Sequence, residues 1–88
     1  MNTLQTFPLR DKKVVATGKL KNYTRRALME LLKNLGALPT YQVSGRTDVL
    51  VVGSNPGQKL EKAHSLGIRI LTESDFETLL SQGQRATG

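Results

Sequence analysis

The fold of this chain is decided by the stretch Lys13-Val14-Val15-Ala16-Thr17-Gly18. Its apolar and β-branched residues follow one another without polar alternation, which predicts a strand that is buried on both faces and closed by the glycine. A second stretch of the same kind, Val49-Leu50-Val51-Val52-Gly53, comes later in the chain. Strands of this type are typical of a parallel sheet that is covered by helices on both faces.

A helix is expected between these two strands. Its apolar residues have the spacing of one helical face and are Leu28, Leu31, Leu32 and Leu35. Thr24 can cap the start of this helix, and Gly36 can end it. Residues 38–43 predict a further strand, and Pro39 restricts that strand to a sheet edge or to its own first residues.

The second half of the chain continues the alternation. After a turn at 54–57, a helix is expected with Gly67 at its C-terminal end and with three inward residues, Leu60, Ala63 and Leu66. Residues 68–71 predict a short strand. Thr72 then opens a last helix with Asp75 as its capping-box partner. The inward residues of this last helix are Phe76, Leu79 and Leu80. The order is therefore βαββαβα, which predicts an α/β fold with a mostly parallel sheet.

Basic charge is concentrated in the first half of the chain. The 88 residues include 13 Lys and Arg and 7 Asp and Glu, which give a formal net charge of +6. The whole excess lies in residues 1–44, because residues 45–88 hold as many acids as bases. This length supports one domain. We expect a disordered lead-in or linker over 1–8, the domain over 9–81 and a flexible tail over 82–88.

Several function classes are excluded by what the sequence lacks. Without cysteine, neither a disulfide framework nor a thiolate metal site can form. No apolar run approaches a membrane span, and the N-terminus has no signal-type apolar region, so we expect a cytoplasmic protein. The chain has no P-loop, dinucleotide fingerprint or nucleophile elbow, and His64 is its single histidine. We therefore expect a non-catalytic binding module without metal or cofactor.

Residues that could hold an anion gather at one edge of the predicted sheet. Parallel sheets bind ligands beyond the carboxyl ends of their strands, and Thr17 and Gly18 end the first strand. The glycine can bring a backbone N–H close to a phosphate, and the helix that starts near Thr24 directs its first amides the same way. Arg25 in that first turn and Lys59 in the second helix are expected to reach this edge. The simpler alternative is a strand end with solvated bases, and spacing alone does not decide between the two.

Taken together, these runs resemble the BRCT domain. The resemblance is carried by Val14-Val15-Ala16-Thr17-Gly18, Arg25, Leu35-Gly36-Ala37, Val43-Ser44-Gly45-Arg46-Thr47-Asp48-Val49-Leu50-Val51-Val52-Gly53, Gly57-Gln58-Lys59-Leu60-Glu61-Lys62-Ala63 and Leu66-Gly67-Ile68. It covers residues 9–81 and is strongest for the C-terminal domain of bacterial NAD-dependent DNA ligases, with the large subunit of the clamp loader also similar. It implies a four-stranded parallel sheet in the order 2-1-3-4, flanked by three helices.

The resemblance also implies a ligand. In clamp-loader-like members, the 5′-phosphate of duplex DNA is bound by the residues that match Thr17, Gly18, Arg25 and Lys59. We expect flanking phosphates to be bound by Lys19, Lys21 and Arg26. Tandem members of the family bind phosphopeptides, but a second repeat completes their pocket, and this chain has one repeat.

Two positions depart from the family pattern. Phe76 stands where many relatives carry tryptophan, and we expect it to be a core residue that anchors the last helix. Arg26-Ala27 replaces an acidic pair that is usual in ligase relatives, which raises the local positive potential. Tyr23 could stack on a sugar or base, although a half-buried packing role is the favoured alternative.

With this resemblance, the chain is predicted to be the BRCT module of a DNA replication or repair protein, namely an NAD-dependent DNA ligase. The module is predicted to bind 5′-phosphorylated DNA ends or nicks. The alternative is a protein-interaction or phosphopeptide-binding module of another repair protein, such as a polymerase exonuclease subunit. Its partners would then be other repair proteins or domains of the host enzyme. We expect a monomer in the bacterial cytoplasm, associated with the nucleoid and without membrane contact.

Overall fold

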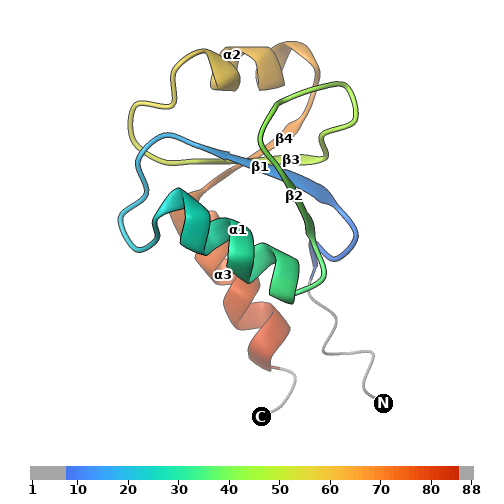
Figure 1. Ribbon diagram of the computed structural model, residues 1–88, viewed down its shortest axis with the longest axis vertical. Coiled ribbons are helices and arrows are strands. Elements are labelled where there is room, and N and C mark those ends of the chain that lie inside the picture. Colours follow the sequence, from blue (N-terminus) through green and yellow to red (C-terminus); the bar gives the residue numbers. More distant parts are fainter. Residues whose placement is uncertain (1–7, 86–88) are drawn as a thin grey trace.

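The strands of the computed structural model form a four-stranded parallel sheet in the order β2-β1-β3-β4 (Figure 1). The strands are β1 (Lys13–Thr17), β2 (Leu38–Thr40), β3 (Val49–Val52) and β4 (Arg69–Thr72). The structure describes residues 8–85 of the chain. The sheet and its strand order confirm the predicted fold class.

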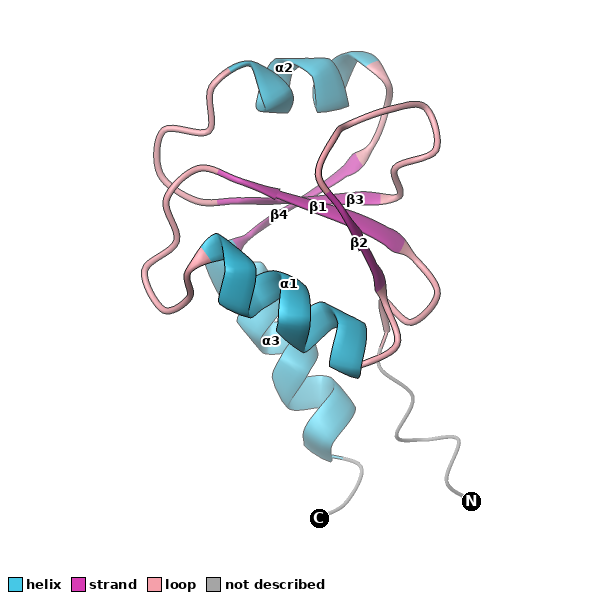
Figure 2. Cartoon of the chain, viewed as in Figure 1, coloured by secondary structure: helices cyan, strands magenta, loops and turns pink. Residues whose placement is uncertain are grey.

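Helices cover both faces of the sheet (Figure 2). One face carries α1 (Arg25–Asn34) and α3 (Glu73–Arg85), and the other carries α2 (Gln58–Ser65). Because all four strands run in the same direction, the ends of β1 and β3 and the starts of α1 and α2 lie at one edge of the sheet. This edge is the one at which the sequence predicts an anion site.

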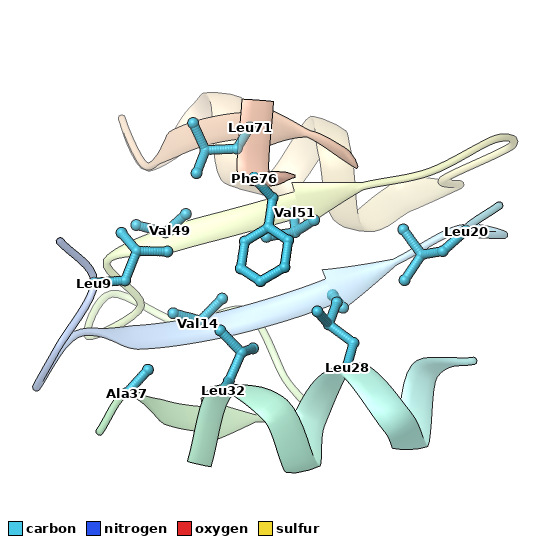
Figure 3. Close-up of a cluster of buried hydrophobic side chains, with 11 residues drawn as sticks. Leu9, Val14, Leu20, Leu28, Leu32, Ala37, Val49, Val51, Leu71 and Phe76 are labelled. Atoms are coloured by element: carbon cyan, nitrogen blue, oxygen red, sulfur yellow. The ribbon is translucent and has the colours of Figure 1, made fainter. Parts of the chain in front are cut away.

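The larger core cluster lies between the sheet and the layer formed by α1 and α3 (Figure 3). Phe76 of α3 is fully buried in this cluster, among side chains of β1, β3 and α1. The predicted core role of Phe76 is confirmed. Leu9 belongs to the same cluster and is only 1% exposed, so the ordered core begins before the first strand.

A smaller core cluster lies on the α2 side and includes Val15, Val43, Leu50 and Ala63. Neighbouring residues of a strand point to opposite faces, which places Val14 and Val15 in different clusters. The predicted inward position of Leu66 is wrong, since its side chain is 46% exposed. The helix ends at Ser65, and Leu66 is its C-cap residue. The Leu66 side chain therefore does not continue the inward face of the helix.

Two strands differ from the prediction in their bounds. β2 ends at Thr40 instead of residue 43, because the chain leaves the sheet edge and buries Val43 in the cluster on the α2 side. A turn follows in which Thr47 N donates to Ser44 O at 3.0 Å. β4 begins at Arg69, one residue later than expected.

The start of α1 follows the prediction, since Thr24 Oγ1 accepts a hydrogen bond of 3.0 Å from Ala27 N. Gly36 follows the end of α1 with a φ of 93°. The predicted leucine face of α1 packs on the larger core cluster, where Leu28 and Leu32 are buried and Leu31 and Leu35 are partly buried against it. Met29, which the leucine spacing does not include, is buried as well.

The capping box of α3 is confirmed. Asp75 N donates to Thr72 Oγ1 at 3.0 Å, and Thr72 N donates to Asp75 Oδ2 at 3.2 Å. The helix continues to Arg85, into the segment that the sequence predicts as a tail. Residues 1–7 of the expected lead-in and 86–88 of the expected tail lie outside the described residues. No helix between residues 8 and 85 is long and apolar enough to cross a membrane.

Candidate anion-binding site

A hollow of about 660 Å³ opens at the carboxyl end of β1. Its walls come from the end of β1, the loop and first turn of α1, and the turn between β3 and α2. The lining residues are Thr17, Gly18, Lys19, Leu20, Tyr23, Thr24, Arg25, Ser54, Asn55 and Pro56. Lys19 and Arg25 give this lining two positive charges, and no carboxylate is among the described residues that line it.

Two glycines bring the walls of the hollow together. Lys19 and Ser54 exchange two backbone hydrogen bonds, of 2.8 and 2.9 Å, so the loops after β1 and β3 are in direct contact. A Cβ at Gly18 would lie 2.7 Å from Ser54 O, and a Cβ at Gly53 would collide with Lys19 O. Gly18 also has a φ of 81°, which glycine adopts without strain. Both glycines are therefore required by the close approach of the two loops.

The Thr17 hydroxyl already has a hydrogen-bond partner within the chain. It is 4% exposed, and its Oγ1 donates to Pro56 O at 3.0 Å. A hydroxyl has a single proton, so Thr17 cannot donate to an anion while this bond is intact. Thr17 instead ties the end of β1 to the turn between β3 and α2. The neighbouring Gly18 N–H has no hydrogen-bond acceptor within residues 8–85, so it remains free to donate.

Arg25 brings positive charge to the same hollow. Its Nη2 donates to Gly18 O over a long 3.4 Å, and this uses one of the five N–H groups of the guanidinium. Thr24 caps α1, so the first amides of the helix lie at the hollow with their partial positive charge. The hollow thus combines a free backbone donor, a helix N-terminus and two cationic side chains.

The loop that carries these groups is anchored by α3. Glu73 accepts hydrogen bonds of 2.7 Å from the backbone nitrogens of both Lys21 and Asn22. Glu77 accepts a further bond of 2.7 Å from Asn22 Nδ2. Lys21 therefore lines a neighbouring hollow together with these two carboxylates, instead of the hollow at the end of β1.

Tyr23 connects this loop to the core. Its ring meets Phe76 edge to face, with ring centroids 6.1 Å apart and an interplanar angle of 77°. Burial raises the pKa of the Tyr23 phenol, and the negative charges of Glu77 and Glu73 raise it further. The side chain is half-buried against the larger core cluster, which confirms the favoured packing role.

Two predicted site residues lie away from the hollow. Arg26 lines a groove between α1 and β2. Lys59 Nζ donates to Tyr41 O at 3.0 Å, and Lys59 is not among the residues that line the hollow. The expected convergence of Lys59 on Thr17 and Gly18 is therefore not found, because its side chain extends toward the loop between β2 and β3.

The sequence analysis missed three residues that contribute to this edge. Ser54 and Asn55 form a wall of the hollow, and Asn55 has a φ of 52°, a left-handed conformation that asparagine tolerates well. Their segment has the composition of a turn, which predicts the turn but not the surface it faces. Glu73 was missed as the anchor of the loop, because nothing in the sequence links it to residues so far from it in the chain.

Comparisons with known proteins agree with the fold. The family model of the BRCA1 C Terminus (BRCT) domain matches residues 5–80. The chain is 50% identical over 70 residues to "DNA ligase 1" of Clostridium acetobutylicum, 50% over 72 residues to the DNA ligase of Natranaerobius thermophilus, and 51% over 71 residues to that of Latilactobacillus sakei. These matches cover 80%, 82% and 81% of this chain but only 11%, 11% and 10% of the relatives. The chain therefore spans about a tenth of the length of the curated relatives it matches.

Proposed function

Because this chain belongs to the BRCT domain family, we propose that it is the BRCT module of a bacterial NAD-dependent DNA ligase and that it binds DNA at a 5′-phosphorylated end or nick. BRCT domains are in general non-catalytic, and the chain matches only a small part of each DNA ligase. Its contribution to such a protein is therefore binding. The catalytic steps belong to other parts of the enzyme.

The observation that carries the proposal is the donor set of the hollow at the end of β1. Gly18 N–H is unbonded within the described chain, Arg25 and Lys19 are cationic, and the lining contains no carboxylate. A phosphate monoester offers two negative charges and several acceptor oxygens, which matches this set in both charge and hydrogen-bonding sense. A neutral ligand would leave two cations without compensation.

Each group has a separate role in this proposal. Gly18 N–H and the first amides of α1 donate to one phosphoryl oxygen, and Arg25 donates to another through its free N–H groups. Lys19 is exposed and supplies charge. Thr17 holds the wall by its bond to Pro56 and can donate to phosphate only if its hydroxyl rotates away from that carbonyl.

Three predicted phosphate contacts lie outside the hollow and have weaker roles in the proposal. Lys59 has to leave Tyr41 O before it can reach a phosphate. The charge of Lys21 is offset by Glu73 and Glu77 in its own hollow. Arg26 lies on the adjacent side of α1, where its proposed contact is with a phosphate other than the terminal one.

The test compares two duplexes of identical sequence, one with a 5′-phosphate and one with a 5′-hydroxyl. We expect the phosphorylated duplex to bind about tenfold more tightly, since charge-assisted hydrogen bonds to the terminal phosphate are lost in the other. Arg25→Ala should remove this discrimination. Arg46→Ala is the matched control, because Arg46 is exposed in the turn after β2 and does not line the hollow.

Equal affinity of the parent chain for both duplexes would contradict the proposal. The alternative, a module that docks repair proteins or domains of its host, predicts no salt-sensitive DNA binding and no effect of Arg25→Ala. A phosphopeptide reader would instead bind a phosphoserine peptide more tightly than the phosphorylated duplex. The location of the protein in the cytoplasm at the nucleoid and its monomeric state remain predictions.

A further inference from the structure

A second groove lies between α1 and the edge strand β2. Arg26, Met29, Glu30 and Lys33 line it from α1, and Pro39 and Tyr41 line it from β2 and the residues after it. The four α1 residues have the spacing of one helical face and form a continuous wall. β2 is the outermost strand at this edge of the sheet, so no further strand of the described chain pairs with it on this side.

Tyr41 is the most prominent feature of this groove. It is 71% exposed, although a ring of this size normally buries most of its surface. Its backbone O accepts the hydrogen bond from Lys59 Nζ at 3.0 Å. An exposed aromatic ring is the kind of platform on which nucleic acid bases stack.

Two cations flank this ring. Arg26 and Lys33 line the groove from α1, and neither forms an ion pair with any residue in the part of the chain that the structure describes. They are seven positions apart on the helix, a rise of about 10 Å, which spans more than one phosphate of an extended strand. Glu30 lies between them and reduces the net charge of the groove without reversing it.

The other obvious occupant of a sheet edge is a peptide strand, and Pro39 disfavours it. Leu38 N donates inward to Lys12 O, so the next nitrogen along β2 is on the outer side of the strand. That nitrogen belongs to Pro39 and has no hydrogen to donate. A peptide that paired with this edge would therefore lack a ladder hydrogen bond at the centre of a three-residue strand.

We propose that the groove between α1 and β2 binds single-stranded DNA, with a base stacked on Tyr41 and backbone phosphates on Arg26 and Lys33. Bases within a duplex have their faces covered by neighbouring bases, so only an unpaired strand can use the ring in this way. The site is separate from the hollow at the end of β1 and does not need a 5′-phosphate. It therefore goes beyond the duplex-end binding proposed above.

The test uses the whole chain and a fluorescent oligo-dT of about twelve nucleotides that carries a 5′-hydroxyl. We expect salt-dependent binding, measured as anisotropy over a range of salt concentrations. Tyr41→Ala should weaken binding about fivefold or more without changing the salt slope, because stacking releases no counterions. Tyr41→Phe keeps the ring and should bind like the parent chain.

Charge variants test the same site by a different quantity. Arg26→Ala and Lys33→Ala should each reduce the slope of log affinity against log salt by about 0.7, the value for one phosphate contact on a single strand. Glu30→Gln should tighten binding. Arg69→Ala is the matched control, since it removes a cation from β4 at the opposite edge of the sheet and should leave the slope unchanged.

The proposal is overturned if the parent chain does not bind oligo-dT at low salt, or if Tyr41→Ala binds like the parent. It is also overturned if Arg25→Ala weakens binding as much as Tyr41→Ala, because the strand would then occupy the hollow at the end of β1. Circular dichroism of each variant checks that the fold is kept. Because the probe has no 5′-phosphate, failure here leaves the comparison of the two duplexes unaffected.

Discussion

At the scale of single residues, Gly53 has two roles, of which the sequence predicts only one. It follows the end of a strand, and it leaves room for the backbone of Lys19. The sequence predicts that Gly18 and Gly53 close their strands, and they do. The implied strand order makes β1 and β3 neighbours, but it does not predict that the two loops touch through the backbone of Lys19 and Ser54. Nothing local to either glycine indicates it.

Gly53→Ala is expected to lower the free energy of unfolding by about 2 kcal/mol or more, because the added Cβ would collide with Lys19 O and backbone atoms must move. The measurement is chemical denaturation. The matched control is Gly45→Ala, where an added Cβ meets nothing within 4 Å, and its effect should stay within about 0.5 kcal/mol. Equal stability of the two variants would contradict the close approach.

Glu73 gives a sharper residue-scale prediction, because two physical effects act on it in opposite directions. Removal of an acid near a DNA site normally strengthens DNA binding by electrostatics. Glu73 also holds the backbone of Lys21 and Asn22 by two short hydrogen bonds, and through them the loop that forms the hollow. We expect positioning to dominate, so that Glu73→Gln reduces the preference for the 5′-phosphorylated duplex although the net charge becomes more positive.

The readout for Glu73→Gln is the ratio of affinities for the phosphorylated and hydroxyl duplexes, which a general charge effect does not change. Asp75→Asn is the control, since it changes the charge equally at the start of α3, but its carboxylate contacts only Thr72. An unchanged ratio in Glu73→Gln, with tighter binding to both duplexes, would show that the residue acts by charge alone.

At the scale of elements, the sequence predicts best where local chemistry decides the structure. β1 and β3 are found where their apolar runs predict them, and α3 begins at the predicted capping box. The errors occur at the ends of elements, where one is caused by a long-range contact and the other by the local end of a helix. β2 ends early because Val43 is buried on the opposite face of the sheet, and Leu66 is exposed because α2 ends one residue before it.

The capping box carries an element-scale prediction. Thr72→Ala removes the hydroxyl that accepts from Asp75 N, and we expect a loss of about 1 kcal/mol in the free energy of unfolding. Thr78→Ala, within α3, is the control, because Thr78 bonds only to Ser74 O of its own helix and alanine is the better helix former. Thermal denaturation should therefore separate the two variants, with Thr78→Ala at least as stable as the parent.

At the scale of the whole molecule, the sequence predicts which edge of the sheet collects positive charge but not where every side chain extends. Thr17, Gly18, Lys19 and Arg25 are close in the chain to one strand end, and the structure brings them to one hollow. Lys59 follows a different strand. The parallel sheet brings its helix to the same edge, but whether its ammonium reaches the hollow depends on the path of the loop after β2. That path is set by tertiary packing.

This difference between Lys19 and Lys59 predicts how much each lysine contributes to the salt dependence of binding to the 5′-phosphorylated duplex. A lysine that contacts a phosphate of duplex DNA contributes about 0.9 to the slope of log affinity against log salt. Lys19→Ala should therefore reduce the slope by that amount. Lys59→Ala should leave the slope unchanged as long as its ammonium stays on Tyr41 O. A reduction in Lys59→Ala equal to that in Lys19→Ala would mean that DNA draws Lys59 away from Tyr41, which the loop after β2 would have to accommodate.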